Sequence, residues 1–206
     1  MSIVRLEDIR PEEISFDCDG VVYPFAKQFI EYVNLRTGSS HDTKNFTDYN
    51  LGFLNLDGQF QNYINEFHRT EGSRLLKPYS SAIHLFDLLN MIGVKPKIIT
   101  SRNPNLKEIT TQSFERDFKG KICAEDIHFT HRKAEKMKEL GSKLIIEDCY
   151  KNAEGVGEAG YLAVLVNHSY NQNGKSNVPD EDHPQVFRMR EKGLLGLIDL
   201  VPSLKS

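Results

Sequence analysis

The fold is decided by the stretch Ile14-Ser15-Phe16-Asp17-Cys18-Asp19-Gly20-Val21-Val22. A short apolar run, preceded by Pro11, is followed by two aspartates with one residue between them and then by a glycine. This pattern predicts a buried strand whose carboxyl end opens into a tight turn. On a continuing strand, Asp17 and Asp19 would point to the same face, because side chains alternate. Two such acids repel each other unless a cation or a shared proton joins them, and Mg²⁺ prefers carboxylate and phosphate oxygens.

Length and composition limit the classes of protein to consider. At 206 residues the chain is long enough for a full core, and we expect one domain with an insertion rather than two equal domains. The net charge of -3 does not indicate binding to nucleic acid or to a membrane surface, but it does not exclude a nucleotide as substrate. No apolar run reaches membrane-spanning length. The three cysteines, Cys18, Cys123 and Cys149, are widely spaced, which predicts no disulfide framework and a cytoplasmic location.

Strands and helices are predicted to alternate along the chain. Apolar runs predict further strands at residues 97–100, 127–130, 144–146 and 162–166. Helical spacing and capping residues predict helices from Pro24 to Gly38, from Phe60 to Phe67 with Gly72 beyond its end, from Ser80 or Ser81 to Gly93, after Asn103-Pro104, from 132 to 140 and around 194 to 200. Residues 39–57 and 167–184 are expected to be mostly loop. This alternation predicts an α/β fold, a parallel sheet covered on both faces, with a small helical insertion after the first strand.

Polar residues follow several predicted strands at the point where each strand ends. In open parallel sheets, ligands bind at the carboxyl ends of the strands, so these side chains should converge on one crevice. They are Asp17 and Asp19, Thr100 and Ser101, Lys133, and Glu147 and Asp148. Together they supply a nucleophile, an acid/base, a hydroxyl, an ammonium group and a metal-binding acid. Phosphoryl transfer requires this set, since it depends mainly on positioning and charge neutralisation.

The same segments resemble the four motifs of the haloacid dehalogenase (HAD) superfamily of aspartate-dependent phosphohydrolases. They occur in the superfamily's order, as residues 16–22, residues 98–102, Lys133 and residues 145–148. Within the superfamily the chain is most similar to the 5'(3')-deoxyribonucleotidase group, on its segments 130–133 and 167–171. The resemblance implies a Rossmann-like three-layer αβα core formed by residues 1–22 and 76–206, with a helical cap at 23–75.

The resemblance also implies a role for each acid. Asp17 would attack phosphorus and form an aspartyl-phosphate, a form of covalent catalysis. Asp19 would protonate the leaving oxygen and then take a proton from the hydrolytic water. Mg²⁺ would be held by Asp17, the backbone carbonyl of Asp19, and Asp148, and would neutralise phosphate charge. Glu147 stands where the nucleotidases usually have an aspartate, and is the weaker candidate ligand.

The remaining motif residues would bind the phosphate. Thr100 would donate a hydrogen bond to it with Ser101 nearby, Lys133 would pair with Asp17 and the phosphate, and Gly20 would let the backbone amides approach. Arg102 either reaches the substrate or lies on the surface. Three further alternatives stay open: Lys136 in place of Lys133, a substrate contact from His131, and insertion aromatics that either stack on a base or form the core of the cap (Phe46, Tyr49, Phe53, Tyr63 and Phe67).

The resulting functional prediction is a Mg²⁺-dependent phosphomonoester hydrolase, acting on a small phosphorylated substrate such as a (deoxy)nucleoside monophosphate. A sugar phosphate or the 3'-phosphate end of a nucleic acid is an alternative, although nucleic acid is not expected as a partner. Another is a non-catalytic protein that binds a phosphorylated ligand on the same fold. Tyr23-Pro24 and residues 78–82 depart from the nucleotidase pattern, which leaves the substrate open. A homodimer is compatible with the sequence.

Overall fold

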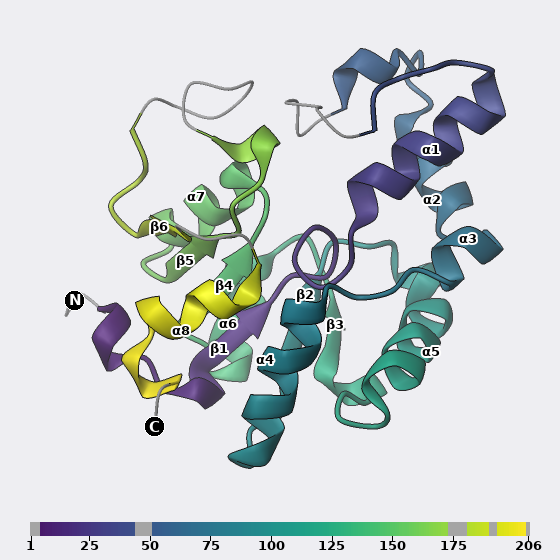
Figure 1. Ribbon diagram of the computed structural model, residues 1–206. Coiled ribbons are helices and arrows are strands. Elements are labelled where there is room, and N and C mark those ends of the chain that lie inside the picture. Colours follow the sequence, from purple (N-terminus) through teal and green to yellow (C-terminus); the bar gives the residue numbers. More distant parts are fainter. Residues whose placement is uncertain (1–4, 44–50, 173–180, 190–192, 205–206) are drawn as a thin grey trace.

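The computed structural model describes residues 5–43, 51–172, 181–189 and 193–204. Its strands form one all-parallel sheet in the order β3-β2-β1-β4-β5-β6, so the strand that leads to Asp17 lies inside the sheet (Figure 1). The register places Ser15 beside Lys97 on one side and Ile145 on the other. The strands are β1 (Ile14–Phe16), β2 (Lys97–Thr100), β3 (Ile127–Phe129), β4 (Leu144–Glu147), β5 (Leu162–Leu165) and β6 (Val186–Arg188).

Helices cover both faces of the sheet, which confirms the predicted three-layer αβα sandwich (Figure 1). The apolar cluster on one face includes side chains of α4 (Ser80–Met91), α5 (Lys107–Phe118) and α8 (Leu197–Leu200). The cluster on the other face includes α6 (Lys133–Leu140) and α7 (Tyr150–Glu158). Successive residues of a strand serve opposite faces, as Ile98 and Ile99 of β2 do. Because both faces are buried, the strands are continuous apolar runs rather than alternating ones.

A helical insertion follows β1 and lies beyond the carboxyl end of that strand (Figure 1). It contains α1 (Phe25–Thr37), α2 (Phe60–Phe67) and α3 (Glu71–Arg74), and we call it the cap. Aromatic rings join α1 to α2, with Phe29 5.7 Å from Phe67 and 5.6 Å from Phe60 between ring centroids. The two chain connections to the cap lie side by side, because the N–H of Tyr79 donates to the carbonyl of Val22 at 2.9 Å.

The aromatic residues of the insertion divide between packing and exposure. Phe67 is buried in the apolar core, and Tyr63 packs against it half-buried, as expected of residues that form the core of the cap. Phe53 is 38% exposed. Phe46 and Tyr49 lie outside the described residues.

Local structure differs from expectation at several points. Pro24 is not the first helical residue but precedes α1, and Gly72 lies beyond the end of α2, as predicted, but within a further short helix, α3. The helix α7 was not predicted, because its sequence contains two glycines and its packing against β5 outweighs a weak propensity. The strand β6 was also missed, since three residues at a sheet edge carry little periodic signal. No helix within the described residues has the length and apolar character needed to span a bilayer.

Glu13 gives the entry to β1 a pH-dependent stability. Its buried carboxylate accepts hydrogen bonds from the backbone N–H and the guanidinium of Arg10, both at 3.0 Å, and pairs with Lys143 at 2.8 Å. Burial alone would raise the pKa of this carboxyl, but these partners lower it to about 2. The stabilisation is therefore complete above the pKa of an unfolded glutamate and is lost as the pH falls toward 2.

We expect Glu13→Gln to lower the free energy of unfolding by about 1–2 kcal/mol at neutral pH, a modest cost because both cationic partners are partly exposed. Urea titrations of the two proteins at neutral pH and at about pH 3 measure the difference, which should narrow in acid. Glu31→Gln is the matched control, since Glu31 forms an exposed pair with Lys27 and should change little. A difference that stays constant with pH contradicts this assignment.

Candidate active site

Asp17 lies at the carboxyl end of β1 and is held there by backbone and side-chain contacts. Its N–H donates to the carbonyl of Ile146 at 2.9 Å, which extends the parallel pairing of β1 with β4 by one residue. The side chain is buried, and Lys133 Nζ donates to its Oδ1 at 2.7 Å. The predicted nucleophile and the predicted ammonium group therefore come together, although they are 116 residues apart in the sequence.

Lys133 binds a second carboxylate, that of Glu147 at the end of β4. The other oxygen of Glu147 accepts the backbone N–H groups of Asp148 at 3.2 Å and Cys149 at 3.3 Å. Burial lowers the pKa of an ammonium group, but the two carboxylates outweigh it and raise the pKa of Lys133. The alternative lysine, Lys136, pairs instead with Glu139 away from these acids. Glu147 thus orients Lys133, and its oxygens are less available to a metal ion than those of Asp148.

Asp148 is positioned by residues 167–171, one of the two segments that resemble the deoxyribonucleotidase group. Tyr170 donates its hydroxyl to Asp148 Oδ2 at 2.7 Å. The side-chain amide of Asn171 donates to the backbone carbonyls of Asp148 at 3.0 Å and Val166 at 2.7 Å. His168 Nε2 donates to the carbonyl of Gly20 at 2.7 Å, so the same segment also holds the turn after β1.

Gly20 is required where it stands for two reasons. Its φ of +77° lies in the left-handed region, and a Cβ built there would lie 2.0 Å from Asp148 Oδ2.

We expect Gly20→Ala to displace Asp148, to lower the midpoint of thermal unfolding and to abolish any activity that needs this carboxylate. Gly38→Ala is the matched control, because Gly38 has a φ of +73° with nothing within 4 Å. Both substitutions place alanine at a positive φ, but only the one at Gly20 also causes a clash. Thermal unfolding and activity assays of both variants therefore separate the two effects. Equal losses of stability and activity in the two variants would contradict this explanation.

The acids at this edge of the sheet fit a divalent cation. One carboxylate oxygen each of Asp17, Glu147 and Asp148 can be chosen so that all lie within 4.8 Å of one another. Burial raises the pKa of Asp17 to about 7, although Lys133 opposes the shift, and burial together with Asp17 raises the pKa of Asp148 well above its ordinary value. Three buried acids share one ammonium group, so all three can be ionised together only if a further cation joins them. Hard oxygen ligands with surplus negative charge suit Mg²⁺.

Asp19 is bound by Arg102, which the sequence left as either a substrate contact or a surface residue. The guanidinium donates to both carboxylate oxygens, from Nε at 2.8 Å and from Nη2 at 2.6 Å. A third bond, from Nη1 to the hydroxyl of Thr110 at 3.2 Å, fixes the arginine. Burial raises the pKa of a carboxyl, but Arg102 outweighs it and lowers the pKa of Asp19. Arg102 is thus a buried residue of the site, and a phosphate contact would have to share it with Asp19.

A cavity of about 250 Å³ lies between the core and the cap. Its core wall includes Thr100, Ser101 and His131 beside the acids. Thr100 Oγ1 accepts the N–H of Arg102 at 3.2 Å, which leaves its own hydroxyl hydrogen free to donate. The cap wall is largely apolar and includes Phe25, Ala26, Leu51, Phe60, Gln61, Ile64 and His68. Each motif residue predicted from the sequence borders this cavity or contacts a residue that does.

His68 was not singled out from the sequence, yet it is a cap residue that comes close to Asp19. Its Nε2 lies 3.9 Å from Asp19 Oδ2, and its side chain is 4% exposed. Burial, and then the positive charge of Arg102, lowers the pKa of His68 to about 3, so the ring is neutral. One histidine after a helix, among seven in the chain, carries no spacing signal that could have identified it.

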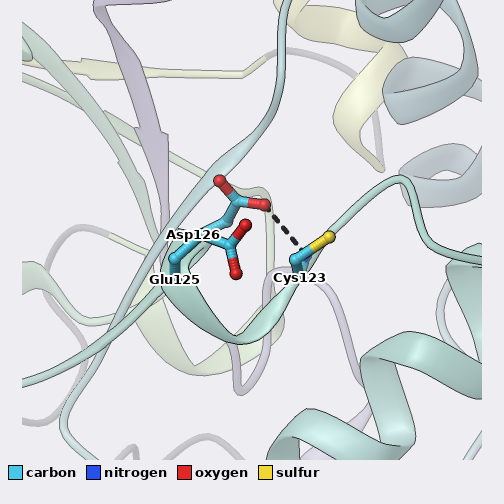
Figure 2. Close-up of side chains that lie close together, drawn as sticks. All are labelled: Cys123, Glu125 and Asp126. Atoms are coloured by element: carbon cyan, nitrogen blue, oxygen red, sulfur yellow. Dashed lines mark hydrogen bonds between the residues drawn. The ribbon is translucent and has the colours of Figure 1, made fainter.

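A second group of metal-binding residue types has a structural explanation. Figure 2 shows Cys123, Glu125 and Asp126 in the turn before β3. Asp126 Oδ2 accepts the backbone N–H of Cys123 at 2.8 Å, which closes the turn. The turn precedes β3, so it lies at the amino ends of the strands, opposite the cavity.

Comparison with known proteins identifies the fold. Protein-family models and curated protein sequences give no match to this chain. Among solved structures, it is similar to a HAD family hydrolase from Deinococcus radiodurans R1 with bound phosphate and sodium, with a TM-score of 0.51, 17% identity, and coverage of 92% of this chain and 87% of that chain.

Two further structures are at least as similar in shape. A HAD-superfamily hydrolase from Ehrlichia chaffeensis gives a TM-score of 0.54 at 13% identity, covering 96% of this chain and 98% of that chain. A HAD hydrolase of family IA, variant 3, from Entamoeba histolytica HM-1:IMSS gives 0.54 at 15% identity, covering 94% and 100%. The chain therefore has the HAD-like α/β fold, and its resemblance to the deoxyribonucleotidase group stays a prediction.

Proposed function

We propose that this protein is a Mg²⁺-dependent phosphomonoester hydrolase that acts through an aspartyl-phosphate on Asp17. The observation that carries the proposal is the convergence of Asp17, Lys133, Asp148 and Thr100 around one cavity at the carboxyl ends of the strands. A neighbour in fold, the Deinococcus radiodurans hydrolase, holds phosphate, which agrees with an anion site on this scaffold. Every position that the reaction needs carries a side chain able to perform its chemical role, which argues against a protein that only binds a phosphorylated ligand.

The first half-reaction would transfer the phosphoryl group to the protein. Asp17 attacks phosphorus through one carboxylate oxygen, and the bond from phosphorus to the leaving oxygen breaks. Lys133 neutralises charge on Asp17 and on the phosphoryl oxygens, while the hydroxyl of Thr100 donates to one of them. The leaving oxygen takes a proton from Asp19, so this step needs the neutral carboxyl, which the ion pair with Arg102 disfavours.

The second half-reaction would release phosphate. Asp19 accepts a proton from a water molecule that attacks phosphorus, while the bond from phosphorus to the Asp17 oxygen breaks and its electron pair returns to the carboxylate. The ion pair with Arg102 favours the ionised form of Asp19 that this step needs. Mg²⁺, held by Asp17, Asp148 and the carbonyl of Asp19, would supply neutralisation of phosphate charge. The cap covers the site and limits the access of water until the substrate has entered.

The proposal predicts dependence on a divalent cation. Hydrolysis of p-nitrophenyl phosphate should be lost in EDTA and restored by added Mg²⁺, because surplus negative charge at Asp17 and Asp148 would otherwise repel the phosphate. Asp148→Asn should raise the Mg²⁺ concentration for half-maximal activity by at least about tenfold, since even residues behind the ligands have effects of that size. Glu158→Gln, at the exposed end of α7, is a control with an unchanged requirement. Full activity in EDTA would contradict the metal assignment.

For the substrate, we propose a nucleoside monophosphate. The cap wall offers aromatic rings from Phe25 and Phe60 together with the polar end of Gln61, which suits a flat group with polar edges. A volume of about 250 Å³ limits the leaving group to a compact one. Phosphate release should be compared across deoxynucleoside and ribonucleoside monophosphates, sugar phosphates and 3'-phosphorylated oligonucleotides. Absence of turnover on every nucleotide, with turnover of another ester, would refute the substrate class and leave the chemistry standing.

A further inference from the structure

His68 is the place where the cap meets the acid/base of the core. The residue follows α2 directly, and its ring is packed between aromatic side chains of the cap. It stacks on Phe25 with ring centroids 5.4 Å apart and planes at 22°, and it lies 5.5 Å from the ring of Phe67. A buried ring held on two sides has a fixed direction. Its orientation is therefore a property of the folded cap.

The hydrogen-bond partner on the outer side is a hydroxyl, which can donate to Nδ1 or accept from it, whereas the carboxylate of Asp19 on the inner side favours an N–H on Nε2. The hydroxyl of Ser73, a buried residue of α3, lies 3.4 Å from Nδ1. When this hydroxyl donates to Nδ1, the neutral ring carries its proton on Nε2. We assign that tautomer, which aims an N–H donor from the cap at the cavity and toward Asp19.

The distance between His68 and Asp19 leaves a space of defined size. At 3.9 Å, Nε2 and Oδ2 are too far apart for a direct hydrogen bond. Arg102 holds both carboxylate oxygens from the other side, so Asp19 cannot turn toward the cap without losing two strong bonds. One ligand oxygen, placed off the line between the two atoms, can lie at about 2.8 Å from each.

We propose that His68 binds the leaving oxygen of the substrate together with Asp19, and that it acts in the phosphorylation half-reaction alone. This inference rests on the proposed phosphomonoesterase function. When the Asp17–phosphorus bond forms, the ester bond breaks and its electron pair goes to the leaving oxygen, which takes the proton of Asp19. The N–H of His68 stabilises the growing charge on that oxygen and keeps its own proton. In the second half-reaction the leaving group is the carboxylate of Asp17, on the opposite side of phosphorus. No negative charge grows on the oxygen that faces His68, so His68 has no comparable part in that step.

Rapid-quench kinetics of two variants test the proposal. His68→Leu fills similar space without a donor, and His68→Gln restores an amide donor at about the same reach. We expect His68→Leu to slow the formation of the phosphoenzyme by about tenfold, the effect of losing one hydrogen bond, with its breakdown unchanged. His68→Gln should recover much of the rate. His84→Leu, at an exposed position of α4, is the control and should match the wild type.

The leaving group provides a second readout that a structural role would not move. The loss in His68→Leu should be larger with an alkyl phosphate than with p-nitrophenyl phosphate, because an alkoxide oxygen needs more stabilisation than a nitrophenolate. Equal slowing of both half-reactions, or equal losses with both esters, overturns the proposal and makes His68 a packing residue. An unchanged rate of formation overturns it as well. A wild-type protein that forms no phosphoenzyme instead overturns the proposed function, and the inference with it.

Discussion

Asp17→Asn is expected to abolish hydrolysis of p-nitrophenyl phosphate, with a loss in kcat of at least about 10³-fold. The amide has the same shape and keeps an oxygen for Lys133, but it cannot attack phosphorus. Steady-state assays at saturating Mg²⁺ measure the loss. Stability should not fall with activity, because the substitution removes one of three mutually repelling buried acids. A thermal-unfolding midpoint equal to or above that of the wild type would show that the chemistry was lost while the fold remained.

The matched control is Asp87→Asn. Asp87 lies on α4, forms a partly exposed ion pair with Lys121 and does not border the cavity. The same chemical change at that position should leave kcat and KM unaltered. An active Asp17→Asn enzyme would remove the nucleophile from the mechanism.

Lys133→Met is expected to have the largest effect on both stability and activity. Without the ammonium group, Asp17 and Glu147 face each other in the core with no cation between them. Removing one partner of a buried ion pair destabilises a protein by about 3–5 kcal/mol, because a charge is left uncompensated. Activity should be lost as well, since the phosphoryl oxygens lose a positive contact. Urea unfolding and phosphatase assays give the two quantities.

Lys136→Met separates the site lysine from its neighbour on the same helix. Lys136 pairs with Glu139, three residues along α6, and should change the free energy of unfolding by less than about 0.5 kcal/mol. A double variant, Lys133→Met with Glu147→Leu, should recover part of the lost stability, because it removes one of the two stranded charges. Equal effects of the two lysine substitutions would contradict the assignment of Lys133.

The sheet and the motif residues were predictable because both depend on local sequence. Apolar runs marked β1 to β5, and polar residues marked the ends of β1, β2 and β4. Once the strands are parallel, their ends meet at one edge, so Asp17, Thr100 and Asp148 had to lie near each other. The helix α7 escaped prediction because packing on the sheet, and not its own sequence, stabilises it.

The pairings inside the site were not predictable, because they join residues far apart in the sequence. The bond between Arg102 and Asp19 spans 83 residues, and the position of His68 depends on how the cap is oriented over the core. Glu147 was the weaker candidate metal ligand by its place after β4; the structure shows that it also binds Lys133, a contact that its position in the sequence did not indicate. Residue type and order indicate the chemistry, whereas the pairing of neighbouring charged groups depends on the three-dimensional structure.

The central claim is a covalent phosphoryl group on Asp17, and acid quenching during turnover tests it most directly. The protein is mixed with p-nitrophenyl phosphate and Mg²⁺, quenched in acid, digested and analysed by mass spectrometry. We expect the peptide that contains residues 14–22 to gain the mass of one phosphoryl group, with fragment ions that place it on Asp17, and the same peptide of Asp17→Asn to gain none. A phosphoryl group on another residue, or rapid turnover with no modified peptide at any quench time, would contradict the account.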